Sequence, residues 1–186
     1  MYWRVRKVTP DMLFKQYGLH LFLAISLLVN VVLFVSRPKK QTVSHEIQTN
    51  FRDFARQVTV HLLDTSYITY LDNTQELHSE LGPGVVKQLK NMGLLPRSKQ
   101  EVTAINLDLQ QSRQVCTLKF DNIKVGEPEP KKNNLVPVDV QGVIAIHSSK
   151  ETSPSQPQPF AFQYWVGLNA KTKKPIVAEF KEQTPG

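Results

Sequence analysis

The sequence predicts an α+β fold, with helices packed on one side of a curved antiparallel sheet of four to five strands, preceded by one transmembrane helix. Three observations predict it: residues 18–36 are apolar and uncharged, apolar residues then recur at helical steps up to about residue 92, and from about residue 116 they alternate with a period of two. Helices followed by strands with one apolar face are typical of α+β domains. Residues 44–186 are enough to form such a domain alone.

The first element is the run at residues 18–36, GLHLFLAISLLVNVVLFVS, which carries no formal charge. As a helix it would rise roughly 28 Å at 1.5 Å per residue, close to the hydrocarbon thickness of a bilayer. A cleaved signal peptide is the alternative, but its apolar region is usually shorter and ends in small residues. We therefore expect a short N-terminus at residues 1–17, a membrane anchor at 18–36 in contact with lipid, and a linker at 37–43.

The positive charge is concentrated at this end of the chain. The net charge is +7, and residues 1–40 alone contribute +6, which leaves the remaining residues almost neutral. A nucleic-acid-binding domain usually carries its basic surface on the folded part, so sequence-specific nucleic-acid binding is not expected. Basic residues flank both sides of the span, and the short N-terminal segment favours an N-terminus inside and a C-terminal domain outside.

Two polar residues inside the span, Ser26 and Asn30, are four apart and would share one helix face. A polar pair in lipid can join helices, which predicts pairing within the membrane and a homo-oligomer. The alternative is that single uncharged polar residues are simply tolerated in an anchor.

The predicted helices follow in order. Hydroxyl residues at 42–44 precede an amphipathic helix that we expect to run to about Tyr70, because apolar residues recur at steps of three and four. Asn73 and Glu76 have capping-box spacing for a second, shorter helix. Pro83 suits the first turn of a third helical piece and Gly93 suits its C-terminal cap.

The predicted strands begin after Pro96. Alternation is weak over residues 105–109 and clear over 116–120, and a register shift between 121 and 125 indicates a bulge. A loop over 126–134 leads to a long alternating strand over 136–146, in which Gly142 would allow the sheet to bend. A second loop over 148–159 precedes a closing pair of strands, over 160–168 and 176–180.

Catalytic and cofactor-binding motifs are absent from the sequence, so no enzyme activity, cofactor or metal is expected. Cys116 is the one cysteine, which excludes an intrachain disulfide and a four-cysteine zinc site. Cys116 with His147 could be imagined as nucleophile and base, but a cysteine on a strand is more often a small core residue.

An alternative function is a membrane-tethered domain that binds or transforms a small apolar molecule. It would use a pocket formed by polar and aromatic side chains of the first helix and the closing strands. The candidate pocket residues are His61, Asp64, Tyr67, Tyr164 and Trp165, with Tyr70 beside them. The alternative for these side chains is that they lie at the edge of the core with their polar tips in water.

Three stretches of this sequence carry a family resemblance. They are FARQVTVHLLDTSYITYLDNTQELHSEL at 54–81 with VVKQLK after the proline, LVPVDVQGVIAIHSS at 135–149, and FAFQYWVGLNAKTKKPIVAEFKE at 160–182. In pattern and order they resemble the TraE family of conjugative type IV secretion systems. The resemblance covers most of the chain. It departs at residues 101–113, which look longer than the family's equivalent, and it lacks the Asn-Pro-x-Gly turn of a related branch.

The resemblance implies a cystatin-like, nuclear-transport-factor-two-like cone that lies in the periplasm at residues 44–186. It also implies a single-pass protein of the inner membrane with a cytoplasmic N-terminus. Such a protein is a non-enzymatic assembly component of a DNA transfer apparatus, which self-associates and docks other envelope proteins of the apparatus.

Overall fold

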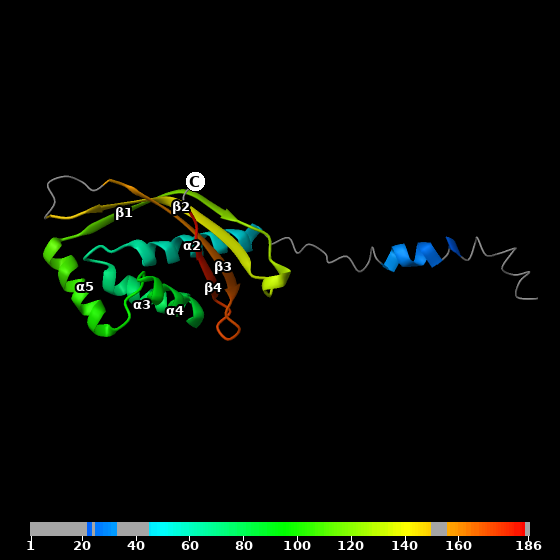
Figure 1. Ribbon diagram of the computed structural model, residues 1–186, viewed down its shortest axis with the longest axis horizontal. Helices are drawn as coiled ribbons and strands as arrows, with labels where there is room; N and C mark the ends of the chain where they lie inside the picture. The colour runs from blue at the N-terminus through cyan, green and yellow to red at the C-terminus, as the bar shows by residue number, and fades with distance from the viewer. Residues whose placement is uncertain (1–21, 24, 33–44, 150–155, 185–186) are drawn as a thin grey trace, which may run out of the picture. The chain divides into compact units, whose positions relative to one another are not determined.

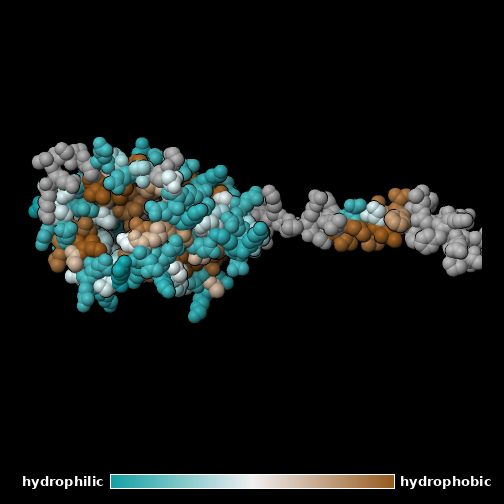
Figure 2. Space-filling model, in the orientation of Figure 1, coloured by the Kyte–Doolittle hydropathy of each residue, from teal (hydrophilic) through white to brown (hydrophobic). Residues whose placement is uncertain are grey.

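The protein divides into two compact units, residues Met1–Lys40 and Gln41–Gly186. The computed structural model describes residues 22–23, 25–32, 45–149 and 156–184. In the first unit the described residues are helical, and their large apolar side chains are exposed (Figure 2). No helix among the described residues has both the length and the apolarity to cross a membrane. Part of the predicted span at 18–36 lies outside the described residues. The predicted N-terminus at 1–17 and the predicted linker at 37–43 lie outside them entirely.

The second unit is an α+β domain in which helices lie against one face of a sheet (Figure 1). Its elements in chain order are α2 (His45–Leu63), α3 (Tyr70–Glu80), α4 (Pro83–Met92), α5 (Lys99–Ser112), β1 (Val115–Val125), η1 (Pro130–Lys132), β2 (Val136–His147), β3 (Gln158–Leu168) and β4 (Pro175–Glu182). The strands form one antiparallel sheet in the order β1-β2-β3-β4. The predicted fold class is confirmed, with four strands.

The predicted first helix ends earlier than expected, and the second begins earlier. α2 ends at Leu63 instead of continuing to Tyr70, because Asp64 turns the chain. Its carboxylate accepts from the Ser66 amide at 3.0 Å and from the Thr69 hydroxyl at 2.8 Å. These local bonds offer the backbone an alternative to helix, as acidic residues often do. α3 then begins at Tyr70, three residues before the predicted cap at Asn73.

The third helix agrees with its prediction. Pro83 is in the first turn of α4, and Gly93 follows the last residue with φ of 77°, a left-handed conformation that glycine adopts without steric cost. The Gly93 amide closes the helix through the carbonyls of Leu89 and Lys90.

The weak strand predicted at residues 105–109 is wrong, because these residues lie in the helix α5. Ser98 caps the helix, because the Glu101 amide donates to Ser98 Oγ at 3.2 Å, and the Arg97 amide just before the cap donates to Glu101 Oε2 at 2.6 Å. Only Leu109 and Ser112 of α5 are buried, so its other apolar residues lie partly or fully at the surface.

The predicted bulge in β1 is confirmed. The register between β1 and β2 shifts between Phe120 and Asn122, which leaves Asp121 as the extra residue. Gly142 of β2 lies opposite Phe120, and a Cβ atom added there would come 2.2 Å from the carbonyl oxygen of Lys119. A side chain at position 142 would therefore force the two strands apart.

The two borders of the sheet differ. β4 receives bonds from outside the sheet: the Gly82 amide donates to the Val177 carbonyl at 2.8 Å, and Gln88 Nε2 donates to the Phe180 carbonyl at 3.1 Å. No described strand pairs with the outer border of β1. One border is thus covered by the segment around α4, and the other is open along most of its length.

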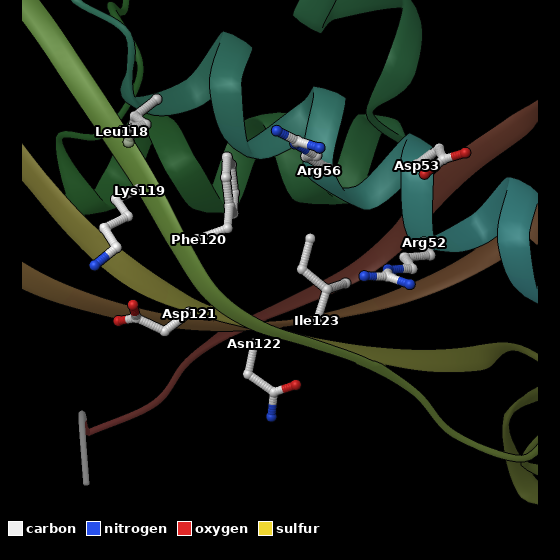
Figure 3. A pocket seen from close by; sticks show the side chains of 9 residues that line it. All are labelled: Arg52, Asp53, Arg56, Leu118, Lys119, Phe120, Asp121, Asn122 and Ile123. Atoms are coloured by element: carbon white, nitrogen blue, oxygen red, sulfur yellow. The ribbon is translucent and has the colours of Figure 1, made fainter.

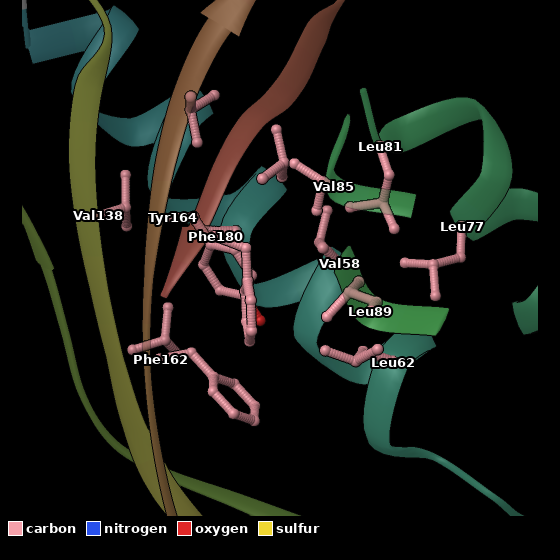
Figure 4. Packing of buried hydrophobic residues seen from close by; sticks show 14 of the residues in the cluster. Val58, Leu62, Leu77, Leu81, Val85, Leu89, Val138, Phe162, Tyr164 and Phe180 are labelled. Carbon is pink, nitrogen blue, oxygen red and sulfur yellow. The ribbon is translucent and has the colours of Figure 1, made fainter. Parts of the chain in front are cut away.

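The core lies between the helical layer and the inner face of the sheet (Figure 4). Helices contribute Val58, Leu77 and Leu89, and strands contribute residues such as Val138 and Phe162. The aromatic rings of Phe162, Tyr164 and Phe180 contact one another at centroid distances of 5.3 to 6.2 Å. The inner face of the sheet is therefore filled by packed side chains.

Candidate functional site

Polar side chains gather where α2 passes α3. His61 of α2 lies between two carboxylates of α3, with Nδ1 2.9 Å from Glu80 Oε2 and Nε2 3.5 Å from Glu76 Oε2. Glu80 is buried, and its second oxygen accepts from Gln57 Nε2 at 2.7 Å. A histidine and two carboxylates are a donor set that a divalent cation accepts. In the structure His61 bonds to both carboxylates, and these contacts join α2 to α3.

A cavity of about 160 Å³ lies next to this cluster. It is bounded by the end of α2, the first half of α3, the α4–α5 loop and the start of α5. The residues that line it are His61, Leu62, Asp64, Thr65, Tyr70, Thr74, Gly93, Leu94, Leu95, Pro96, Glu101 and Ile105. Burial and the nearby charge of Glu101 raise the pKa of Tyr70, although a bond with Thr74 lowers it in part. The Tyr70 hydroxyl is therefore neutral in the physiological range.

A larger hollow of about 530 Å³ lies between α2 and the open border of β1 (Figure 3). Arg52, Asp53 and Arg56 come from α2, and residues 118–123 come from β1. Phe120 points toward α2, where the guanidinium of Arg56 lies 5.2 Å from its ring centroid. Lys119 and Asn122 point away from the helix. The hollow is thus walled by a basic helix face on one side and an unpaired strand on the other.

The amides along this border alternate in direction. The Cys116 amide donates outward to Ser66 Oγ at 2.8 Å, and successive residues of a strand point their amides to opposite sides. Up to the bulge, the backbone groups of Leu118 and Phe120 therefore also face away from β2, into the hollow.

A third hollow, also of about 530 Å³, lies where α2 and α3 face the β3–β4 turn. Glu76 and Glu80 lie on one side of it and Lys174 on the other. Its lining is mixed, with Phe54, Pro175 and Ile176 beside these charges.

The structure brings together only part of the predicted pocket. His61 and Asp64 line the same cavity, whereas Tyr164 is fully buried in the core with its hydroxyl 3.0 Å from Thr59 Oγ1. Burial raises the pKa of Tyr164 well above its usual range. Trp165 follows Tyr164 on the strand and so points to the opposite face of the sheet.

Trp165 and Tyr67 lie outside that cavity. Trp165 Nε1 donates to Glu129 Oε1 at 3.1 Å, and Lys132 Nζ lies 3.4 Å from the centre of the indole ring. Tyr67 is half-buried, and its amide donates to the Gln114 carbonyl at 2.9 Å. The Trp165 side chain thus contacts Glu129 and Lys132 in the β1–β2 connection, whereas Tyr67 is tied to Gln114 through its backbone.

Two other pairs considered from the sequence can now be placed. Asn30 Nδ2 donates to the Ser26 carbonyl at 2.9 Å, so the two residues share one helix face, and their role in helix pairing stays a prediction. Cys116 pairs with Ile146 across the sheet, which puts His147 on the opposite face. The Cys116 thiol instead contacts Thr65 Oγ1 at 3.1 Å.

Two features were not predicted from the sequence. They are the hollow between α2 and β1, which we call the basic groove, and the cavity beside Tyr70. Arg52 and Arg56 are four apart on α2, a spacing that already put two positive charges on one helix face. Glu101 and Tyr70 are 31 positions apart, and only the fold brings them to one cavity.

No protein-family model matches the sequence, and no curated protein matches it either. Solved structures do match. A TraE protein in complex with 2-(2-furyl)isonicotinic acid superposes with a TM-score of 0.57 at 8% identity, covering 78% of this chain and 100% of that chain. The domain has the TraE fold.

Two further structures agree with this. A TraE protein in complex with 4-(1H-pyrrol-1-yl)pyridine-2-carboxylic acid gives a TM-score of 0.55 at 11% identity, over 78% of this chain and 100% of that one. A TraE protein in complex with 2-chloroisonicotinic acid gives 0.55 at 10% identity, over 77% and 98%. The resemblance to TraE expected from the sequence is confirmed for the fold, while the cystatin-like cone stays a prediction.

Proposed function

We propose that this protein is a non-enzymatic assembly component of the apparatus that transfers DNA in conjugative type IV secretion. In this proposal residues 1–17 lie in the cytoplasm, residues 18–36 cross the inner membrane, and residues 44–186 form the periplasmic domain. The protein self-associates and docks other envelope proteins of the apparatus.

The observation that carries the proposal is the match to TraE, which spans the full length of two solved TraE chains. The chemistry of the described residues supports an assembly role. Both nitrogens of His61 face carboxylates, the Tyr164 hydroxyl is buried in the core, and Cys116 and His147 lie on opposite faces of the sheet. None of these groups converges with a partner in the nucleophile–base arrangement that covalent catalysis uses.

The groove between α2 and β1 is the surface that we propose for docking. The outward backbone groups of Leu118 and Phe120 can pair with an extended segment of another apparatus protein, which would add a strand to the sheet. Arg52 and Arg56 flank this border, and they favour a segment that carries acidic side chains. Self-association is assigned separately, to the polar face of the membrane helix at Ser26 and Asn30.

Conjugation assays test the function. We expect deletion of the coding sequence from cells that carry the transfer system to abolish DNA transfer, and the wild-type chain supplied in trans to restore it. Wild-type transfer frequency in the deletion strain would overturn the proposal. Neighbouring coding sequences for other conjugation components would support it.

A charge reversal tests the docking surface. Arg56→Glu should fail to restore transfer although the protein accumulates normally, because it places a negative charge where an acidic segment binds. Lys87→Glu, an exposed change of the same kind on α4, is the matched control and should restore transfer. Equal complementation by both variants would exclude the groove as a docking site while leaving the wider function intact.

A further inference from the structure

A histidine of α2 faces two carboxylates of α3 at close range. His61 Nδ1 lies 2.9 Å from Glu80 Oε2, and His61 Nε2 lies 3.5 Å from Glu76 Oε2. One possible metal-binding atom from each of the three side chains lies within 4.8 Å of the other two. Zinc binds imidazole nitrogen and carboxylate oxygen at about 2.0–2.2 Å, so small side-chain shifts would bring all three donors to one ion.

The negative charge of this cluster exceeds the positive charge that the protein supplies. Glu80 is 7% exposed, and a buried carboxylate needs a positive partner. Among the described residues, His61 is the one basic side chain in ion-pair contact with either carboxylate. Even a protonated His61 would balance only one of the two. A divalent cation would balance both carboxylates and leave the imidazole neutral, which is the form that binds metals.

A fourth side chain holds the buried carboxylate in place. Gln57 lies one turn before His61 on α2, and its Nε2 donates to Glu80 Oε1 at 2.7 Å. Hydrogen bonds of this kind orient the carboxylates that bind metals in proteins. Glu76 lies one turn before Glu80 on the same face of α3, and its side chain is 62% exposed. The cluster is therefore open to solvent beside Glu76, where water can supply a further ligand.

The nitrogen donor decides which metal suits the cluster. Magnesium and calcium prefer sites made of oxygen atoms, whereas imidazole suits zinc, which often takes three protein ligands and one water. We propose that His61, Glu76 and Glu80 bind one zinc ion, which joins α2 to α3. The sequence shows no zinc motif because His61 and Glu76 are 15 positions apart and lie on different helices. This zinc site is separate from the proposed docking groove between α2 and β1.

Calorimetric titration of the full-length protein with zinc chloride tests the proposal, with magnesium chloride as the comparison. We expect one zinc ion to bind per chain and to raise the melting temperature, because the ion binds the folded state. Magnesium should not bind. Absence of saturable zinc binding would overturn the site and leave the cluster as an ion pair. Equal binding of both metals would also overturn it, because the carboxylates alone would then attract any divalent cation.

Matched variants locate the binding. Glu76→Gln should weaken zinc binding at least about tenfold, since even the residues that orient a metal ligand are worth about 10–100-fold in affinity. Asp72→Asn makes the same chemical change at an exposed position one turn earlier on α3 and should bind as the wild type does. His78→Gln removes an exposed histidine of α3 and should also bind normally. Unchanged affinity in Glu76→Gln, or equal weakening in either control, would place the zinc elsewhere and overturn the site.

Discussion

The hydroxyl of Tyr164 donates to Oγ1 of Thr59 across the core, at 3.0 Å. The direction follows from the second bond of Thr59, whose own proton goes to the Ala55 carbonyl at 2.8 Å. This relay joins β3 to α2 between two fully buried side chains. It is a polar contact inside the core, and the two partners differ because, of the two, Thr59 alone has a second hydrogen bond.

We expect Thr59→Val to be more destabilising than Tyr164→Phe. Valine leaves the Tyr164 hydroxyl buried without an acceptor, which costs about 1–3 kcal/mol, whereas phenylalanine leaves Thr59 still bonded to Ala55 and costs about 1 kcal/mol. Urea denaturation of both variants measures the two free energies of unfolding. A larger loss in Tyr164→Phe would mean that the relay runs in the opposite direction.

Stability should fall steeply at alkaline pH. Burial raises the pKa of Tyr164 in the folded state, so the neutral hydroxyl contributes stability that is fully present below the unfolded pKa of about 10. That contribution is lost as the pH rises from there toward the folded value. Unfolding free energies measured from pH 8 to 11 should decline less in Tyr164→Phe than in the wild type. Parallel declines would show that other groups control alkaline unfolding.

Two glycine substitutions should have opposite effects. Gly142→Ala places a Cβ atom 2.2 Å from the Lys119 carbonyl oxygen, so the strands must separate, and we expect a loss of more than about 2 kcal/mol. Gly84→Ala meets nothing within 4 Å on α4, and it should stabilise the protein by about 0.4–1 kcal/mol by restricting the unfolded chain. Thermal melts of both variants provide the comparison, and a neutral Gly142→Ala would contradict the close approach.

A cysteine at Lys171, in a Cys116→Ser background, tests the proposed topology. Lys171 is exposed in the β3–β4 turn, so a thiol there is accessible to reagents. We expect an impermeant maleimide to label it in intact spheroplasts. Labelling only after lysis would place the domain on the cytoplasmic side instead.

Asn30→Leu should lower self-association of the full-length protein without affecting membrane insertion. Leucine retains the apolar surface of the helix and removes the amide that can bond to a neighbouring helix. Cross-linking yield in membranes measures the effect, and carbonate extraction checks insertion. An unchanged yield would remove these residues from the interface.

The sequence predicted the parts of the fold that local chemistry decides. Pro83 and Gly93 define the ends of α4 through the conformations open to proline and glycine. The alternation over β2 and the shifted register of β1 predicted a bulged strand pair. These features depend on residues close together in the chain.

The predictions were wrong where two local sequence patterns favoured different structures. The spacing of Ile105, Leu107 and Leu109 suits a strand as well as a helix, and the N-cap bond from the Glu101 amide to Ser98 favours the helix. Asp64 ends α2 through hydrogen bonds of its side chain, and the spacing of apolar residues gives no information about such bonds. The predicted pocket failed to assemble at Tyr164, because that residue shares the core face of β3 with Phe162. The relation between Tyr70 and Glu101 needed the tertiary structure.

The unequal borders of the sheet restrict how copies of this protein could polymerise. Since Gly82 and Gln88 already bond to the carbonyls of Val177 and Phe180 on β4, β1 is the border of the described sheet that is more open to an added strand. A sheet with one open border can pair with one added strand and has no second open border for another. When two copies pair β1 against β1, both open borders are used, so this mode of assembly ends at a dimer.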